Sequence, residues 1–337
     1  MKNLHSSMMN LFVPAVILMG LAANPSIAQD SAKAPAKPFI AGQPLGVTLE
    51  GKFTSMSKNV KVYGAVVNAE SCSYDASRGL IVVPNRGADQ NQVPNDGFVS
   101  LLNHDGSVHT AKWIGATRDG LTLNHSFGSD IVNGILYVAD IDGGTMATEP
   151  TVAVIRKFNM KTGAPTGELR HPQSPGLNDI AVSADGTIYG TQTRVPGQTP
   201  DPSHSKVFKI TAQGAVSELI VGPPLRAPNG IALDNDGNLV VVNIDNNEVL
   251  TFSLDGKLLK TEHAVQPGND GLVIMKDGTK YVSSVRQGGV SRIRPGQPAE
   301  LIASGIPSAA SMCYDSGANQ LVIPMNPNNG VALIPLR

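Results

Sequence analysis

The amino-acid sequence predicts an all-β protein, a six-bladed β-propeller with four-stranded blades. Three observations support this fold class: a repeated strand–turn–strand unit, a composition with 35 glycines and 24 prolines, and the absence of long helix-period patterns. Only 4% of the residues are aromatic, which suits short strands and tight turns better than a helical core.

The N-terminal residues have the pattern of a secretory signal peptide. Lys2 precedes an apolar run over residues 11–23, and the small residues Ser26 and Ala28 favour cleavage after Ala28. The run is shorter than the roughly 20 apolar residues that a membrane-spanning helix needs. We therefore expect a signal peptide over 1–28, a flexible Pro/Ala/Lys leader over 29–45, a periplasmic or secreted location and no membrane insertion.

Composition also bounds the partners. The formal net charge is -1 and 16% of the residues are charged, so the chain has no basic field of the kind that binds nucleic acid. We expect a small-molecule substrate, no nucleic acid and a monomeric state.

The chain has two cysteines, Cys72 and Cys313. A single disulfide joining the two ends of the fold is conceivable in an oxidising compartment. The alternative, which we favour without excluding the bridge, is two buried free thiols: if both cysteines lie on inner strands of neighbouring blades, packed sheets about 10 Å apart hold their Cα atoms too far from each other.

The repeated unit is a polar residue that opens a strand, an Asp-Gly turn seven positions later, and a second apolar strand. Three copies are clear: LNDIAVSADGTIYGTQ, PNGIALDNDGNLVVVN and NDGLVIMKDGTKYVSS. Weaker copies begin at Glu70 and Ser126, and a last one begins at Ser308. Six units at spacings of roughly 40 to 55 residues are typical of a propeller.

Each unit continues with a second hairpin, which gives four strands per blade. The last unit supplies only three strands before the sequence ends at VALIPLR. We expect the missing outer strand to come from GVTLEGKF, residues 46–53, so that an N-terminal strand closes the ring and one domain spans 46–337.

The residues that open the inner strands should converge on one end of the central axis. They combine two carboxylates, two amides and two hydroxyls: Glu70, Ser126, Asn178, Asn229, Asp270 and Ser308. Such a set is costly to bury without compensation, and oxygen-only ligands with a formal charge of minus two match Ca²⁺. We therefore expect Ca²⁺, or another divalent cation, held by Glu70, Asn178, Asn229 and Asp270.

The alternative is that these Asn and Asp residues only cap turns at the starts of strands. Capping explains one or two of them, but not the same polar register in three consecutive units. Zinc is disfavoured because the histidines lack a zinc-ligand spacing. There is also no GxSxG elbow, P-loop or GxGxxG.

The motifs LNDIAVSADGTIYGT, APNGIALDNDG and NDGLVIMKDG, together with Glu70, resemble the family of gluconolactonase, regucalcin and luciferin-regenerating enzyme, with paraoxonases as more distant relatives. The resemblance implies a calcium-dependent propeller hydrolase. It also implies that Glu70, Asn229 and Asp270 are metal ligands, and that Asn178 is a ligand or a substrate contact.

Two positions depart from the family pattern. Members that act on sugar lactones usually have an arginine where this chain has Gly176, which argues against sugar lactones. The Gly-Pro and aromatic residues that usually follow the first-blade glutamate are Ser71, Cys72 and Ser73 here, so the pocket is expected to differ in shape.

The expected function is hydrolysis of a lactone or related ester, with the cation polarising the carbonyl and activating water. Asp270 is the base by resemblance, whereas His125 is the better base by its intrinsic pKa. A solvated rim position is the alternative for His125. Arg226 and Arg286 are candidate substrate-binding residues beside Asn178.

The main rival is a non-catalytic exported propeller that binds a ligand or a protein partner around a structural metal. A propeller lyase or redox protein ranks third, because the sequence contains no haem CxxCH motif.

Overall fold

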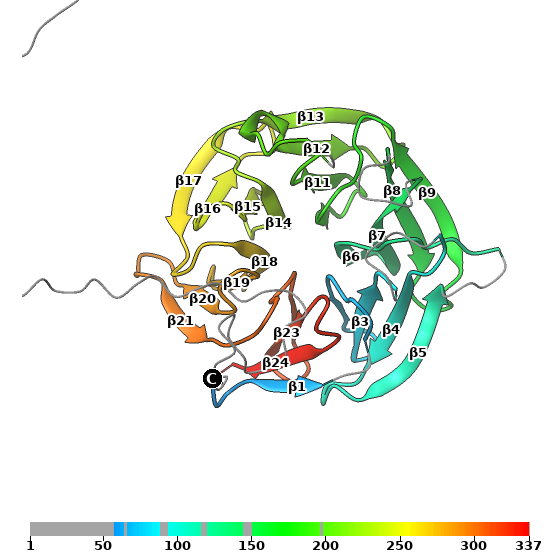
Figure 1. The fold of residues 1–337 in the computed structure, drawn as a ribbon, viewed down its shortest axis with the longest axis horizontal. Helices are drawn as coiled ribbons and strands as arrows, with labels where there is room; N and C mark the ends of the chain where they lie inside the picture. Colours follow the sequence, from blue (N-terminus) through cyan, green and yellow to red (C-terminus); the bar gives the residue numbers. More distant parts are fainter. Residues whose placement is uncertain are drawn as a thin grey trace, which may run out of the picture. The chain divides into compact units, whose positions relative to one another are not determined.

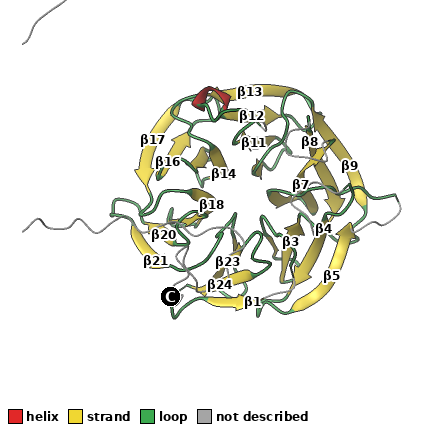
Figure 2. Ribbon diagram, viewed as in Figure 1, coloured by secondary structure: helices red, strands yellow, loops and turns green. Residues whose placement is uncertain are grey.

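The computed structural model describes residues 57–63, 66–87, 94–115, 120–143, 150–195 and 198–336. The signal peptide, the leader and the strand predicted over 46–53 lie outside these residues. The described chain is almost entirely β, with one short 3₁₀-helix, η1 (Pro202–His204). Figure 2 shows this single turn of helix at the periphery, beside β13 (Val216–Val221).

Six four-stranded antiparallel sheets are arranged radially about a common axis (Figure 1), which confirms the predicted propeller. Blade 1 contains β2 (Ser73–Asp75), β3 (Leu80–Asn85), β4 (Phe98–Leu102) and β5 (Val108–Gly115). Blade 2 contains β6 (Ser129–Val132), β7 (Ile135–Asp142), β8 (Val152–Asn159) and β9 (Pro165–His171). Blade 3 contains β10 (Ile180–Val182), β11 (Ile188–Gln192), β12 (Lys206–Ile210) and β13.

The remaining blades repeat this order from the axis outward. Blade 4 contains β14 (Pro228–Leu233), β15 (Leu239–Asn243), β16 (Glu248–Phe252) and β17 (Leu258–His263). Blade 5 contains β18 (Asn269–Ile274), β19 (Lys280–Ser284), β20 (Val290–Ile293) and β21 (Glu300–Ala303). Blade 6 contains β22 (Cys313–Asp315), β23 (Gln320–Pro324), β24 (Val331–Pro335) and, as its outer strand, β1 (Lys61–Tyr63).

An N-terminal strand closes the ring, as predicted, but it is not the expected one. β1 pairs antiparallel with β24, with Lys61 opposite Leu333 and Tyr63 opposite Val331. In Figure 1 the blue β1 lies beside the red β24. The three residues of β1 are too few to produce a recognisable alternation, whereas residues 46–53 have the longer sequence pattern of a strand.

The core consists of six apolar clusters, one between each pair of neighbouring blades. Strand β3 shows the cause, because successive side chains point to opposite faces of a sheet. Leu80 and Val82 pack toward blade 2, whereas Ile81 and Val83 pack toward blade 6. Both faces are buried, so the second strands of blades 1 and 4, LIVVPN and LVVVN, are buried along their whole length and are apolar up to the final asparagine.

The two cysteines form a disulfide, which corrects the expectation of free thiols. Cys72 precedes β2 and Cys313 begins β22, and their Cα atoms are 5.4 Å apart. The sheet spacing of about 10 Å applies to parallel layers, but radial blades approach one another toward the axis. The bridge joins the first and last blades across a sequence separation of 241 residues.

Candidate functional site

The predicted site residues lie where the inner strands begin. Asn229 and Asp270 are the second residues of β14 and β18, while Glu70 and Asn178 stand shortly before β2 and β10. Glu70, Asn229 and Asp270 are buried, with exposed fractions of 3%, 1% and 3%. Asn178 is half-buried.

Hydrogen bonds between blades fix this level of the ring. The carbonyl oxygen of Asn178 accepts from the main-chain N–H of Gly128 at 2.7 Å, and the carbonyl oxygen of Asn229 accepts from Thr191 Oγ1 at 2.6 Å. The carbonyl oxygen of Glu70 accepts from the N–H of Ser311 at 3.2 Å. The main chain at these three site residues is therefore held from the neighbouring blade.

The glycine after Asn229 is required by this close approach. A Cβ atom on Gly230 would lie 2.2 Å from the carbonyl oxygen of Asp270, which is main chain and has little freedom to move. The glycine of this Asn-Gly pair is therefore needed for packing, because any larger residue at position 230 would push blades 4 and 5 apart.

Two predicted ligands contact each other directly. Asn229 Nδ2 donates to Asp270 Oδ2 at 3.1 Å. The other side-chain oxygens, Asn229 Oδ1 and Asp270 Oδ1, are buried and have no hydrogen-bond partner among the described residues. Buried polar atoms without partners are costly, and two neighbouring oxygens of this kind fit a bound cation.

Glu70 is paired on both oxygens. Its Oε1 lies 2.8 Å from Arg86 Nη2, and its Oε2 accepts from Asn326 Nδ2. Burial raises the pKa of Glu70, although Arg86 and Asn326 act in the opposite direction. The pKa of Asp270 is raised well above its ordinary value, mainly by burial and further by the negative charges of Glu70 and Asp179.

The donor set therefore combines two carboxylates with amides. Among the described residues, no three His, Cys, Asp or Glu side chains gather closely enough to hold a metal by themselves. A cation at this level would have to rely on the amide oxygens of Asn229 and Asn178 as well as on Glu70 and Asp270. Oxygen ligands of this mixed kind suit Ca²⁺ better than zinc.

A third carboxylate, which the sequence interpretation missed, lies one residue beyond Asn178. Asp179 accepts from the N–H groups of Ile180 and Ile231, and Ser311 Oγ donates to its Oδ2 at 3.4 Å from the opposite blade. Burial raises its pKa to about 7. It lines a polar cavity of about 420 Å³ along the inner strands, whose walls also include both cysteines.

The second blade places an aromatic residue at this level. Phe127 donates its main-chain N–H to Ala139 O, as Asn178 does to Thr191 O, so these residues are structural equivalents. Ser126, the predicted opener, instead donates its hydroxyl to the carbonyl oxygen of Asn85. The guanidinium of Arg86 lies 4.4 Å from the centre of the Phe127 ring.

His125 is buried beside this aromatic residue, with an exposed fraction of 6%, and is not a solvated rim residue. Its ring lies 5.2 Å from that of Phe127, and its Nδ1 has no partner in the described part of the chain. Burial, together with the positive charge of Arg86, lowers the pKa of His125 to about 3. The intrinsic basicity that favoured His125 as a base is therefore reduced, and the imidazole is neutral at pH 7.

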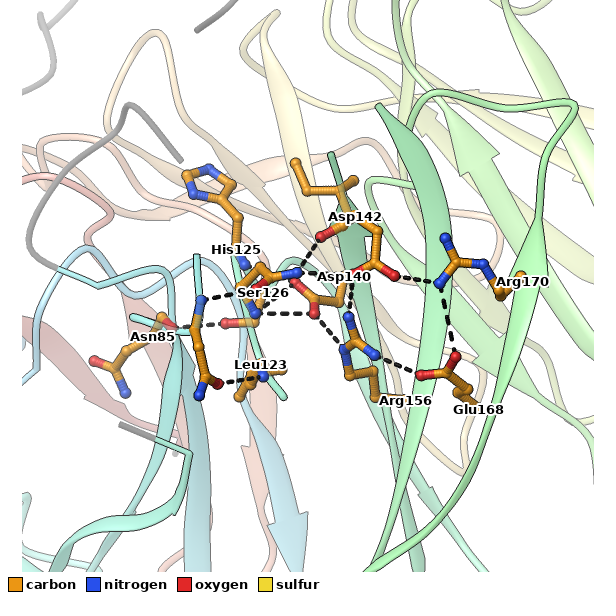
Figure 3. A network of polar contacts seen from close by, with 12 residues as sticks. Asn85, Leu123, His125, Ser126, Asp140, Asp142, Arg156, Glu168 and Arg170 are labelled. Atoms are coloured by element: carbon orange, nitrogen blue, oxygen red, sulfur yellow. Dashed lines mark hydrogen bonds and ion pairs between the residues drawn. The ribbon is translucent and has the colours of Figure 1, made fainter. Parts of the chain in front are cut away.

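An ion-pair network of blade 2 fixes the main chain at His125 (Figure 3). Asp140 accepts from the N–H of Asn124 at 3.0 Å and from the N–H of His125 at 2.6 Å. Arg156 Nε donates to Asp140 at 2.6 Å and continues the network to Asp142. Figure 3 shows the His125 ring pointing away from this network.

The predicted substrate-binding arginines lie at the rim. Arg286 pairs with Asp245 at 2.7 Å, Arg194 pairs with the same carboxylate at 2.7 Å, and Arg226 is exposed. A cleft of about 360 Å³ is lined by Asn178 and Arg194, and its described lining includes neither Arg226 nor Arg286.

Two comparisons with known proteins bear on this fold and site. The fold and the site of this chain define a class, a six-bladed propeller with a polar cluster at the axial ends of its inner strands. A sequence profile described as "SMP-30/Gluconolactonase/LRE-like region" matches residues 112–323, more than half of the chain. The protein therefore belongs to the SMP-30/gluconolactonase/LRE-like family. No curated protein matched the sequence.

Solved structures share the fold at low sequence identity. A gluconolactonase from Xanthomonas campestris is 19% identical with a TM-score of 0.57, and the match covers 89% of this chain and 95% of that chain. A luciferin-regenerating enzyme is 13% identical with a TM-score of 0.56, covering 82% and 95%. Virginiamycin B lyase from Staphylococcus aureus is 14% identical with a TM-score of 0.54, covering 82% and 100%. None of the described helices has the length and apolar character to span a membrane.

Proposed function

We propose that this protein is a calcium-dependent hydrolase of a lactone or related ester, with a divalent cation held by Glu70, Asn178, Asn229 and Asp270. The observation that carries the proposal is the pair of buried, unpartnered oxygens Asn229 Oδ1 and Asp270 Oδ1. Family membership supports the reaction class, because gluconolactonases give the family part of its name.

A divalent cation bound there would supply a Lewis acid that polarises the substrate carbonyl and makes water more acidic. The residues of the chain would supply position and proton transfer. Asn229 orients Asp270 through its 3.1 Å hydrogen bond to Oδ2, so that the other carboxylate oxygen, Oδ1, stays available to the cation or to water. We assign Asp270 as the general base by family resemblance. His125 is the alternative base that the sequence suggests, but burial lowers its pKa to about 3 and makes it a weak proton acceptor.

His125 and the rim arginines have narrower roles in this proposal. The neutral imidazole would offer a hydrogen bond to substrate or water more readily than it would accept a proton. Asn178 would contact the substrate where the cleft begins. Arg226 and Arg286 are left as binders of substrate groups that extend beyond the cleft.

The first experiment is a calcium titration followed by melting temperature and by turnover of lactones, aryl esters and phosphotriesters. A binder that stabilises only the native state raises the melting temperature with concentration. Asp270→Asn should abolish both the calcium-dependent shift and any turnover. The matched control is Asp236→Asn, which removes one carboxylate from an exposed turn of blade 4 and should change neither.

Two outcomes would count against the proposal. Full activity in Asp270→Asn would exclude the site, whereas calcium stabilisation without turnover of any ester or lactone would favour a binding protein. Unchanged turnover in His125→Gln would remove that residue from the mechanism. We also propose export, which predicts a purified mature protein whose N-terminal residue is Gln29.

A further inference from the structure

A cleft lies beside Asn178, one of the proposed cation ligands. Its walls come from blades 2, 3 and 4 and are mainly apolar: Phe127, Ile141, Pro175, Leu177 and Ile244. Its volume of about 360 Å³ falls within the range of roughly 300–1,000 Å³ that is typical of small-molecule pockets.

Three polar groups of the cleft already have partners in the protein: the hydroxyls of Thr151 and Thr193 and one guanidinium nitrogen of Arg194. Thr151 Oγ1 donates to the carbonyl oxygen of Pro175, and Thr193 Oγ1 donates to the carbonyl oxygen of Pro228 at 2.7 Å. Arg194 Nη2 pairs with Asp245 at 2.7 Å. The other side-chain polar groups of the lining are the Asn178 amide and the remaining nitrogens of Arg194. These are few hydrogen-bonding groups to replace the water that each hydroxyl of a sugar ring would lose on entering.

Gly176 keeps the cleft open. A Cβ atom at this position would meet only Ile141 Cγ2, at 3.3 Å, so a larger side chain would extend into the cleft against that wall. No positive φ requires glycine there, so the small residue is a matter of space.

Two residues of the cleft wall relate it to the proposed reaction centre. Asn178 belongs both to the predicted ligand set and to the cleft. Phe127 forms another wall, and both Arg86 and His125 contact its ring.

We propose that the substrate is a lactone or ester with an apolar alkyl or aryl substituent, which occupies this cleft while the carbonyl lies near Asn178. The inference rests on the proposed function. It places sugar lactones among the poor substrates.

The test is a series of γ-lactones with side chains of one, three and five carbons, compared with glucono-δ-lactone, in the calcium-loaded full-length mature protein. Burying each methylene should raise kcat/KM about fourfold until the cleft is filled. Gly176→Leu should reduce the ratio of long-chain to short-chain kcat/KM to near one. Val221→Ala, at a surface position 49% exposed on β13, is the matched control and should leave the ratio unchanged.

Ile244→Ala gives a second reading if Gly176→Leu fails to fold. It enlarges the cleft and should move the preference to longer chains. A flat chain-length series in the unmodified protein, or faster turnover of glucono-δ-lactone, would overturn the inference.

If no lactone is hydrolysed, the proposed function fails and calorimetric binding decides the inference separately. An apolar ligand would be supported if the unmodified protein binds the γ-lactone with the five-carbon side chain but not glucono-δ-lactone, and if Gly176→Leu no longer binds that γ-lactone. Absence of such binding would overturn it.

Discussion

The buried His125 makes the stability of the fold depend on pH. Its folded-state pKa is about 3, compared with 6.5 for the free side chain. Above pH 6.5 the imidazole is neutral in both states and contributes no pH dependence. Between pH 6.5 and about 3 the unfolded chain binds a proton that the folded chain does not, so stability falls as the pH falls.

The magnitude follows from the width of this window. Each pH unit below 6.5 costs about 1.4 kcal/mol, so the unmodified protein should lose roughly 2 to 3 kcal/mol at pH 4.5 through this residue. His125→Gln removes the titrating group. Between pH 7 and pH 4.5 the free energy of unfolding of this variant should therefore fall by roughly 2 to 3 kcal/mol less than that of the unmodified protein.

Urea denaturation at both pH values, without added divalent cations, measures the two differences. Comparing the pH-induced losses cancels the general acid sensitivity of the carboxylates. His109→Gln, at an exposed position, is the control and should behave like the unmodified protein. Equal losses in the unmodified protein and in His125→Gln would refute the argument that burial holds this imidazole neutral.

Three further perturbations test the packing. Replacing Cys72 and Cys313 with serine should lower the free energy of unfolding by about 3–5 kcal/mol because the bridge closes a very long loop; an unchanged urea midpoint would contradict this. Gly230→Ala should raise the calcium concentration at the midpoint of the stabilisation curve at least tenfold, because the added Cβ would contact the carbonyl oxygen of Asp270 in β18. An unchanged midpoint would show that blades 4 and 5 can move apart without disturbing the site. Arg156→Met should cost about 3–5 kcal/mol in urea denaturation by leaving Asp140 buried without its ion pair, and the Asp140→Asn/Arg156→Met double variant should recover part of that loss. No recovery would indicate that the side chains act independently.

The sequence was sufficient for the architecture because the repeat fixes the register. An Asp-Gly turn and a polar opener at constant spacing define the inner hairpin, and alternation on two buried faces explains the apolar strands. The closing strand and the disulfide could not be predicted in the same way. β1 is too short for a period, and the separation of Cys72 from Cys313 depends on radial convergence, which a pairwise sheet spacing does not contain.

Part of the candidate site was also visible in the repeat. Glu70, Asn229 and Asp270 lie at one level because their blades share the register. Blade 2 departs from this register. The main-chain N–H of Phe127 donates to Ala139 O, twelve residues on, whereas that of Asn178 donates to Thr191 O, thirteen residues on, so the inner hairpin of blade 2 is one residue shorter than that of blade 3. Counting back from the turn therefore leads to the wrong neighbour.

Charge neighbours were harder to foresee. Arg86 follows β3, and no repeat signal marks it, yet it pairs with Glu70 and affects the pKa of His125. Asp179 directly follows Asn178 and lies outside the repeated position seven residues before the turn, so the repeat does not mark it. The pKa values of these groups depend on burial, which is a property of the assembled ring and not of any local pattern.

The seam between blades 6 and 1 is fastened at two radii, by a covalent link near the axis and by strand pairing at the rim. Loss of either fastening leaves the other to hold the first and last blades together. We therefore expect thermal opening to begin at one of the five other inter-blade boundaries, with amide hydrogen exchange fastest there and slowest where the two ends of the chain meet.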